Sequence, residues 1–254
     1  MTPPQPETPP AGRAYRATTP WRAMPALAIA FAASFAPVLL VFLDPLVEGL
    51  GFPPSPSVPG QALPPLSSPA VLLQMIAGQV LSFTIIWLAA GWRDARQATL
   101  KTGPGQTGWL TAAGLGVLLI VLITPVELAL YSLAGLDPFT DGRWLLEGLR
   151  SPLWWGVVII AVVLAPLWEE VTFRGLLLSA LAQTRIGFWP AAALSSLLWT
   201  LLHWGYSWPG LVSVFMAGIG LSWIMQRTSS MRAVVVAHGV INAFSLVVVS
   251  TFAP

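Results

Sequence analysis

Seven apolar runs of about 20 residues recur along this 254-residue chain, and they limit the fold more than any other feature. A helix rises about 1.5 Å per residue, so runs of this length can cross a hydrocarbon core of roughly 30 Å. Only 9% of the residues are charged, whereas soluble domains carry about 25%. The sequence therefore predicts an integral membrane protein with an all-α fold, a polytopic bundle of transmembrane helices. The predicted spans are 24–43, 69–91, 109–133, 152–183, 188–204, 208–226 and 233–251.

The fourth run is unusually long and contains Pro166, so a break at that residue would raise the count to eight spans. Residues 1–23 are rich in Pro, Thr and Arg and offer little apolar surface to bury, which predicts a disordered cytoplasmic tail. Residues 24–254 then form a single transmembrane domain. A secretory signal is the rival interpretation of 24–43, but this apolar run is longer than the 7–15 residues typical of a signal core.

The loops between the runs carry their basic residues asymmetrically. Arg143 and Arg150 are the basic residues on one side, where five acidic residues accompany them. Because Lys and Arg favour the cytoplasmic side, we predict a cytoplasmic N-terminus in a prokaryotic plasma membrane. The net charge of +2 follows from this topology, and no nucleic-acid partner is predicted. The basic residues of the other side are Arg13, Arg16, Arg22, Arg93, Arg96, Lys101, Arg185, Arg227 and Arg232.

Two adjacent glutamates, Glu169 and Glu170, lie inside the fourth run, and Arg174 follows four residues later. Ionisable groups in hydrocarbon cost roughly 2.5–3.5 kcal/mol each, so a chain that keeps them there has a use for them. Glu170 and Arg174 have the i, i+4 spacing of a helical ion pair. Glu169 is turned about 100° away and has no local counter-charge, as a general base requires. An ion pair that only holds helices together is the alternative interpretation.

The two histidines of the chain lie in later runs. The helical rise brings His203 to the same depth as Glu169, so the two would meet across an antiparallel hairpin if their faces agree. His238 and Asn242 have i, i+4 spacing and supply two hydrogen-bond donors on one face, as an oxyanion requires. The alternatives are a packing role for His203 and a polar clamp between helices for His238 and Asn242. Gly239 leaves room for a substrate backbone or for a packed helix.

These pieces form three motifs in order, Glu-Glu-x-x-x-Arg, aromatic-x-x-x-His and His-x-x-x-Asn. Their combination resembles the CPBP family of intramembrane proteases, which includes type II CaaX prenyl endopeptidases and bacteriocin-processing enzymes, also called Abi proteins. The resemblance covers a core of about 152–254. It implies that Glu169 and His203 activate a water, that Glu170 and Arg174 support them as an ion pair, and that His238 and Asn242 form the oxyanion hole.

The resemblance also bears on the substrate pocket and the cofactor. Trp199 opens the second motif where the family usually has Phe, and Trp199 and Phe173 are expected to line the pocket. The family has been called metalloprotease, and Glu169, His203 and His238 could ligate zinc or another divalent metal. The chain has no His-Glu-x-x-His motif, and zero cysteines exclude thiol ligands, so we favour a metal-free hydrolase. The expected partners are the lipid bilayer and a peptide or membrane-protein substrate.

Two other functions remain as alternatives. An ion- or proton-coupled transporter also carries embedded Glu, Arg and His, but the chain lacks an inverted repeat, and its reactive groups other than Glu127 follow residue 165. Glu127 is expected near the outer end of the third span, outside the site. An inactive membrane scaffold or immunity protein is the third option, and it would not need a water-activating pair.

Overall fold

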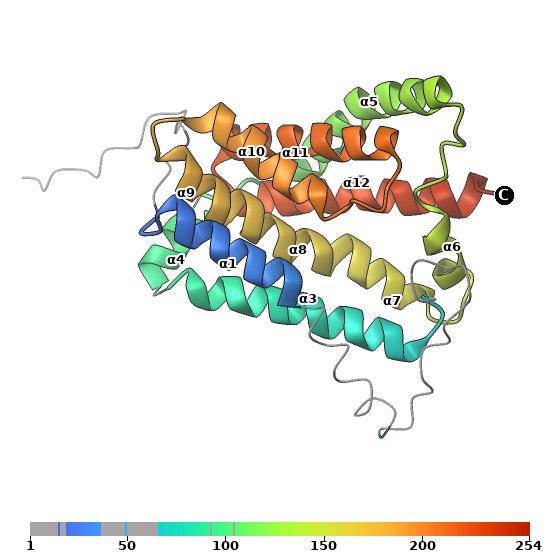
Figure 1. The fold of residues 1–254 in the computed structure, drawn as a ribbon, viewed down its shortest axis with the longest axis horizontal. Coiled ribbons are helices and arrows are strands. Elements are labelled where there is room, and N and C mark those ends of the chain that lie inside the picture. The colour runs from blue at the N-terminus through green and yellow to red at the C-terminus, as the bar shows by residue number, and fades with distance from the viewer. Residues whose placement is uncertain (1–14, 16–18, 37–48, 50–65, 92, 104) are drawn as a thin grey trace, which may run out of the picture.

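The computed structural model describes residues 15, 19–36, 49, 66–91, 93–103 and 105–254. Every regular element in these ranges is a helix, which confirms the all-α prediction (Figure 1). Five helices are long and apolar enough to cross a membrane, and two shorter apolar helices complete the seven predicted runs; part of the first run, from residue 37, lies outside the described residues. The five are α3 (Pro69–Ala89), α5 (Trp109–Ala134), the continuous helix Trp154–Ala182, α11 (Trp208–Thr228) and α12 (Met231–Phe252), and the shorter two are α1 (Ala23–Phe35) and α10 (Phe188–Leu201).

The helix Trp154–Ala182 continues through Pro166, so the break that would have raised the count from seven spans to eight does not occur. Pro166 is the second residue of α8 and follows closely on the π-helix that ends at Leu164, where the ladder of backbone hydrogen bonds is already shifted. Proline has no N–H group, so one backbone carbonyl of the helix loses its donor. Local π adjustments of this kind let a membrane helix tolerate that loss. The continuous helix Trp154–Ala182 has five parts, which are α7 (Trp154–Val158), the π-helix η2 (Ile159–Leu164), α8 (Ala165–Glu170), the π-helix η3 (Val171–Leu177) and α9 (Leu178–Ala182).

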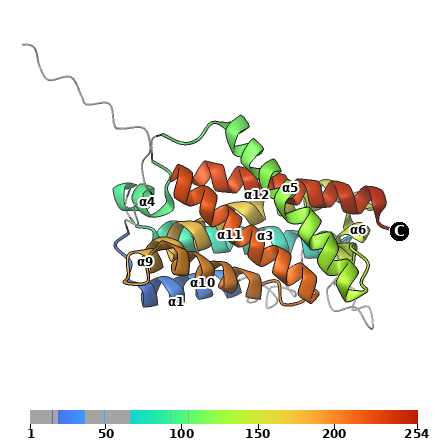
Figure 2. The ribbon, with the colours of Figure 1, turned by 90° about the horizontal axis from the view of Figure 1, so that it is seen from above.

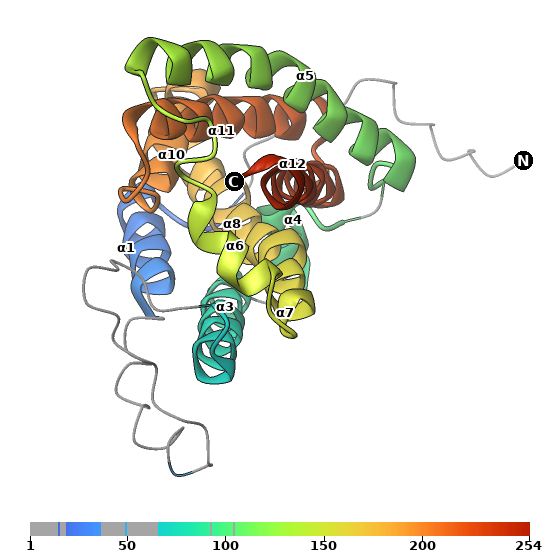
Figure 3. The ribbon, with the colours of Figure 1, turned by 90° about the vertical axis from the view of Figure 1, so that its right-hand side faces the viewer.

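This segmented helix is the centre of the bundle. It contacts α1, α3, the short helix α4 (Arg93–Leu100), α10, α11 and α12, whereas α5 packs outside on α11 and α12 (Figure 3). In an apolar stretch of 18 residues, 56% of the residues are buried in Trp154–Ala182, compared with 11% in α5. Figure 2 shows α5 crossing the bundle over α11 and α12. The paired glutamates therefore lie on the best-shielded helix of the described structure.

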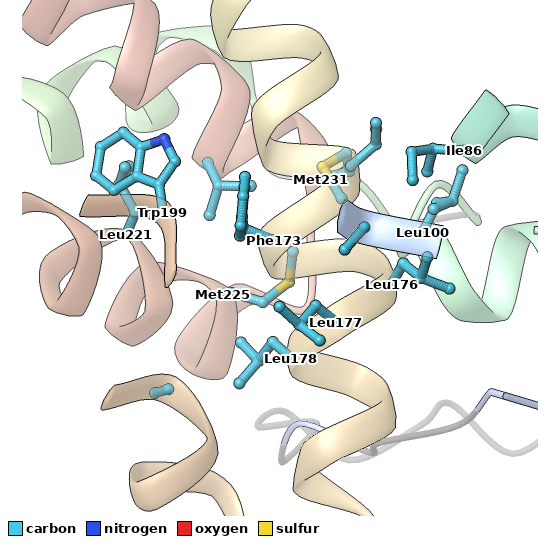
Figure 4. Packing of buried hydrophobic residues seen from close by; sticks show 14 of the residues in the cluster. Ile86, Leu100, Phe173, Leu176, Leu177, Leu178, Trp199, Leu221, Met225 and Met231 are labelled. Atoms are coloured by element: carbon cyan, nitrogen blue, oxygen red, sulfur yellow. The ribbon is translucent and has the colours of Figure 1, made fainter. Parts of the chain in front are cut away.

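Aliphatic side chains of η3 and α9 are fully buried in the core. Leu176, Leu177 and Leu178 are fully buried and pack with Met225 and Met231 (Figure 4). Lipid tails are as apolar as these side chains, so close packing, rather than removal from water, stabilises the contacts between the helices. This packing holds the central helix rigidly beside α11 and α12.

The fifth span ends earlier than predicted. α10 stops at Leu201, so His203 lies in the following turn and not on the helix. The backbone N–H of His203 donates to the carbonyl of Thr200, three residues back, at 2.9 Å, which tightens and closes the helix. At 14 residues α10 is roughly 21 Å long, shorter than the hydrocarbon core. Irregular backbone at such depth is tolerated where protein buries it or where it lines a wet cavity.

Part of the predicted disordered tail is bound to the bundle. The hydroxyl groups of Tyr15 and Ser179 are 2.9 Å apart, and the indole N–H of Trp21 donates to the carbonyl of Ala89 at 2.8 Å. The side chain of Gln183 donates to the carbonyl of Trp21 at 2.7 Å. These described residues anchor the approach to α1, and residues 1–14 and 16–18 of the tail lie outside the described residues.

Candidate functional site

The paired glutamates stand where α8 meets η3. Glu170 and Arg174 are both fully buried, and Arg174 Nη1 lies 2.9 Å from Glu170 Oε1. The ion pair predicted from the i, i+4 spacing is therefore present. Neither charge would be tolerated there alone, because an isolated ion in a low-dielectric interior costs several kcal/mol.

Glu170 also fixes the orientation of His238. His238 Nδ1 lies 2.8 Å from Glu170 Oε1, the same oxygen that receives Arg174. An ionised carboxylate only accepts hydrogen bonds, so Nδ1 carries the proton and donates. The other nitrogen of the ring, Nε2, then faces Glu169 Oε2 at 4.0 Å. The imidazole that meets both glutamates is that of His238 on α12, a contact that sequence spacing did not indicate.

Trp199 connects most of the predicted site residues. Its indole N–H donates to Glu169 Oε2 at 2.6 Å, and the guanidinium carbon of Arg174 lies 4.4 Å from the centre of the ring. The rings of His203 and His238 meet it edge to face, with centroids 5.2 and 5.3 Å away. We predicted Trp199 as an aromatic pocket wall, but its hydrogen bond to Glu169 went unrecognised. A phenylalanine at this position could not make that bond, because it has no N–H group.

His203 reaches the site through Trp199 rather than through Glu169. Its Nδ1 lies 3.1 Å from the carbonyl oxygen of Trp199, which can only accept, so Nδ1 donates. The ring of Tyr206 packs against it with centroids 5.3 Å apart. Within the described ranges, no hydrogen bond or ion pair joins His203 to Glu169. The predicted pairing of these two residues on a water stays a prediction.

Asn242 and Gly239 fasten α12 to the π-helix η2. The Asn242 side-chain nitrogen donates to the carbonyl of Ala161 at 2.8 Å, which leaves the second hydrogen of the amide for another acceptor. A Cβ atom at Gly239 would lie 2.8 Å from the carbonyl oxygen of Val162. Of the two uses we considered for Gly239, the structure supports helix packing and not the approach of a substrate.

We expect Gly239→Ala to destabilise the protein by about 1–3 kcal/mol, because the new methyl group meets backbone that cannot rotate away. Gly114→Ala on α5 is the matched control, since no atom lies within 4 Å of its added Cβ. That control should be neutral or stabilising by up to about 1 kcal/mol, as alanine favours a helix. Unfolding midpoints in detergent measure the change in stability of each variant. Equal midpoints for the two variants would contradict the close contact.

The three residues named as possible metal ligands do not form a metal-binding group in the described part of the chain. Among the residues with assigned positions, no group of three or more His, Cys, Asp or Glu side chains could hold a metal ion. His238 and His203 both bond through Nδ1, so Nε2 is the nitrogen of each ring that a metal could use. A catalytic zinc needs three ligands at roughly 2.0–2.2 Å. Glu169, His203 and His238 do not fit such a site as they lie.

Two further predicted residues lie outside this cluster. Phe173, expected in the substrate pocket, is buried in the hydrophobic core, and its carbonyl accepts from the hydroxyl of Ser195 at 2.8 Å. Glu127 is half-buried on α5, and within the described part of the chain it forms no hydrogen bond or ion pair with Glu169, His203 or His238. Phe173 supports the helix that carries the glutamates.

Comparison with known proteins agrees with the motifs. Residues 151–244 match the family model described as type II CAAX prenyl endopeptidase Rce1-like, and this region contains all three motifs. The UPF0177 protein YajF of Lactococcus lactis subsp. lactis (strain IL1403) is 35% identical over 81 residues. That alignment covers 32% of this chain and 38% of the relative. No solved structure matches.

Proposed function

We propose, from the match of residues 151–244 to the Rce1-like family, that this integral membrane protein is an endopeptidase that cleaves a peptide or membrane protein within the bilayer. One observation carries the proposal. The Glu169 carboxylate is held by the indole of Trp199 and faces His238 Nε2 at 4.0 Å, beside a fully buried ion pair. A separation of 4.0 Å is too long for a direct hydrogen bond, so both groups stay available to reacting atoms.

In the proposed mechanism Glu169 is the general base. It takes a proton from a water whose oxygen attacks the scissile carbonyl, and it later returns that proton to the leaving amine. Trp199 holds the carboxylate in place through its 2.6 Å hydrogen bond. His203 is the second residue that binds the water. Its Nδ1 donates to a backbone carbonyl, so Nε2 is the nitrogen that accepts a hydrogen bond from the water and orients it.

The developing oxyanion is assigned to His238 and Asn242. Each is fixed by one hydrogen bond, His238 to Glu170 and Asn242 to the carbonyl of Ala161. Asn242 keeps its second amide hydrogen as a donor, and His238 becomes a donor to the oxyanion through Nε2 when the ring is in its doubly protonated, imidazolium form. Groups that are held in place before the reaction stabilise new charge without the cost of reorienting. Glu170 and Arg174 support the site by holding His238 rather than by touching the substrate.

We propose that the chain works without a metal, with its N-terminus in the cytoplasm of a prokaryotic cell. The absence of a converging ligand set in the described ranges supports the first point. Two basic residues support the second, Arg185 between α9 and α10 and Arg227 in the last turn of α11, because both lie at the end of the bundle where α1 begins (Figure 1).

Labelled peptides incubated with the purified protein in liposomes test the function. We expect endoproteolytic cleavage, identified by mass spectrometry of the products, at rates that a chelator leaves unchanged. Paired substrates with and without a prenylated C-terminal cysteine would define the substrate class. Loss of cleavage with chelator and its return with zinc would overturn the metal-free mechanism. Ion flux without any proteolysis would favour the transporter.

A further inference from the structure

Asp141, in the segment between α5 and α6 (Arg143–Leu149), binds the turn between α10 and α11. Its Oδ1 accepts from the backbone N–H of Ser207 at 2.8 Å, and its Oδ2 accepts from the hydroxyl of Ser207 at 2.7 Å. The hydroxyl of Tyr131 on α5 donates to the same Oδ2 at 2.5 Å. Figure 3 shows this segment passing α11 and α10 on its way to α6. Asp141 precedes the region 151–244 that matches the family.

The start of α11 is shaped for this carboxylate. Ser207 is the N-cap residue of the helix, and its hydroxyl accepts from the backbone N–H of Gly210 at 3.4 Å. A carboxylate is stabilised at a helix N-terminus by the unpaired N–H groups there. A Cβ atom at Gly210 would overlap Asp141 Oδ2, so only glycine permits the contact. The carboxylate, the N-cap and Gly210 together form a clamp on the turn.

The clamped turn carries the aromatic ring that holds His203. Tyr206 directly precedes Ser207, its backbone N–H donates to the carbonyl of His203 at 2.8 Å, and its ring meets the imidazole at 74°. The imidazole also meets Trp199, which binds Glu169. A continuous series of contacts therefore links Asp141 to the proposed base.

We propose that Asp141 is a positioning residue for His203. By fixing Ser207 it sets the place of Tyr206, and Tyr206 presses the imidazole against Trp199. His203 lies beyond the end of α10, so helix geometry alone cannot fix its ring. The effect on catalysis rests on the proposed peptidase function, whereas the effect on the imidazole does not.

Histidine NMR tests the proposal apart from activity. The chain has two histidines, so its ring resonances form two sets, which His203→Gln would assign. Asp141→Ala should shift or broaden the His203 signals and leave those of His238 unchanged. It should also lower kcat about tenfold with KM changed by less than about twofold, since small misplacements of reacting groups cost rate rather than binding. Asp141→Asn keeps an acceptor for the Ser207 N–H, so its His203 signals and its kcat should both be close to those of the wild type.

Asp137→Ala is the matched control in the same segment. Asp137 is exposed and bonds within its own loop, to the backbone N–H of Phe139 at 2.7 Å and to Arg143 at 2.5 Å. Its loss should leave both histidines and kcat unchanged. If Asp141→Ala does not fold, Tyr206→Leu, which removes the ring from His203, replaces it and should move the same signals.

Unchanged His203 signals in a folded variant would overturn the proposal, as would equal shifts of both histidines, which indicate general loosening. Shifted His203 signals with wild-type kcat would overturn its catalytic part. If the wild type cleaves no peptide but Asp141→Ala still shifts the His203 signals, the positioning role is supported and the proposed function fails.

Discussion

Glu169→Gln is expected to lower kcat for peptide cleavage by about 10²–10⁴-fold, the range that general-base catalysis contributes. Glutamine has the same shape, and its amide oxygen can still accept the Trp199 N–H that now binds the carboxylate at 2.6 Å. It cannot take a proton from water. The variant should therefore fold and bind substrate as the wild type does, and KM should stay within about twofold because the loss falls on the transition state.

Glu147→Gln provides the matched control for this prediction. It makes the same chemical change on α6, where the side chain is exposed and accepts a hydrogen bond from Ser67. We expect wild-type kcat from the control and wild-type unfolding midpoints from both variants. Cleavage by Glu169→Gln at the wild-type rate would remove Glu169 as the base.

Arg174→Leu should destabilise the protein by about 3–5 kcal/mol, since removing one partner of a buried ion pair leaves the other charge uncompensated. Glu170 would keep only His238 as a partner, at 2.8 Å, in a fully buried place. The ring of Trp199 would also lose the guanidinium 4.4 Å from its centre. Denaturant unfolding in mixed micelles measures the change in free energy.

The double variant Glu170→Leu with Arg174→Leu separates stability from function. Replacing both charges by apolar groups is often neutral or stabilising, so the double variant should recover most of the loss caused by Arg174→Leu. Its activity should still fall by about tenfold or more, because His238 no longer has an acceptor to orient Nδ1. Additive destabilisation in the double variant would show that the two residues are not energetically coupled.

The structure also explains how ionisable residues can occupy a membrane helix here. Glu170 Oε1 pairs with both Arg174 and His238, and Trp199 covers Arg174 and binds Glu169. Buried charges persist in apolar surroundings when they are paired and hydrogen-bonded. The same contacts that make these residues tolerable also orient the groups that the proposed reaction uses.

Much of this protein was predictable from the order of its residues, because some constraints are local. A span must be apolar over the thickness of the bilayer, and α3, α5, α11 and α12 begin and end within about two residues of their predicted limits. Helical periodicity likewise placed Glu170 with Arg174, an ion pair that the structure contains.

Other features depended on how the helices rotate and pack, which a local pattern does not encode. The rise per residue predicts the depth of Glu169 and His203, but it does not predict which ring each would face, and Trp199 stands between them. The π-helical stretches, the early end of α10 and the contact of Asp141 with Ser207 have the same origin. The contact of Asp141 with Ser207 joins residues far apart in the chain, so only the packed bundle brings their atoms within bonding distance.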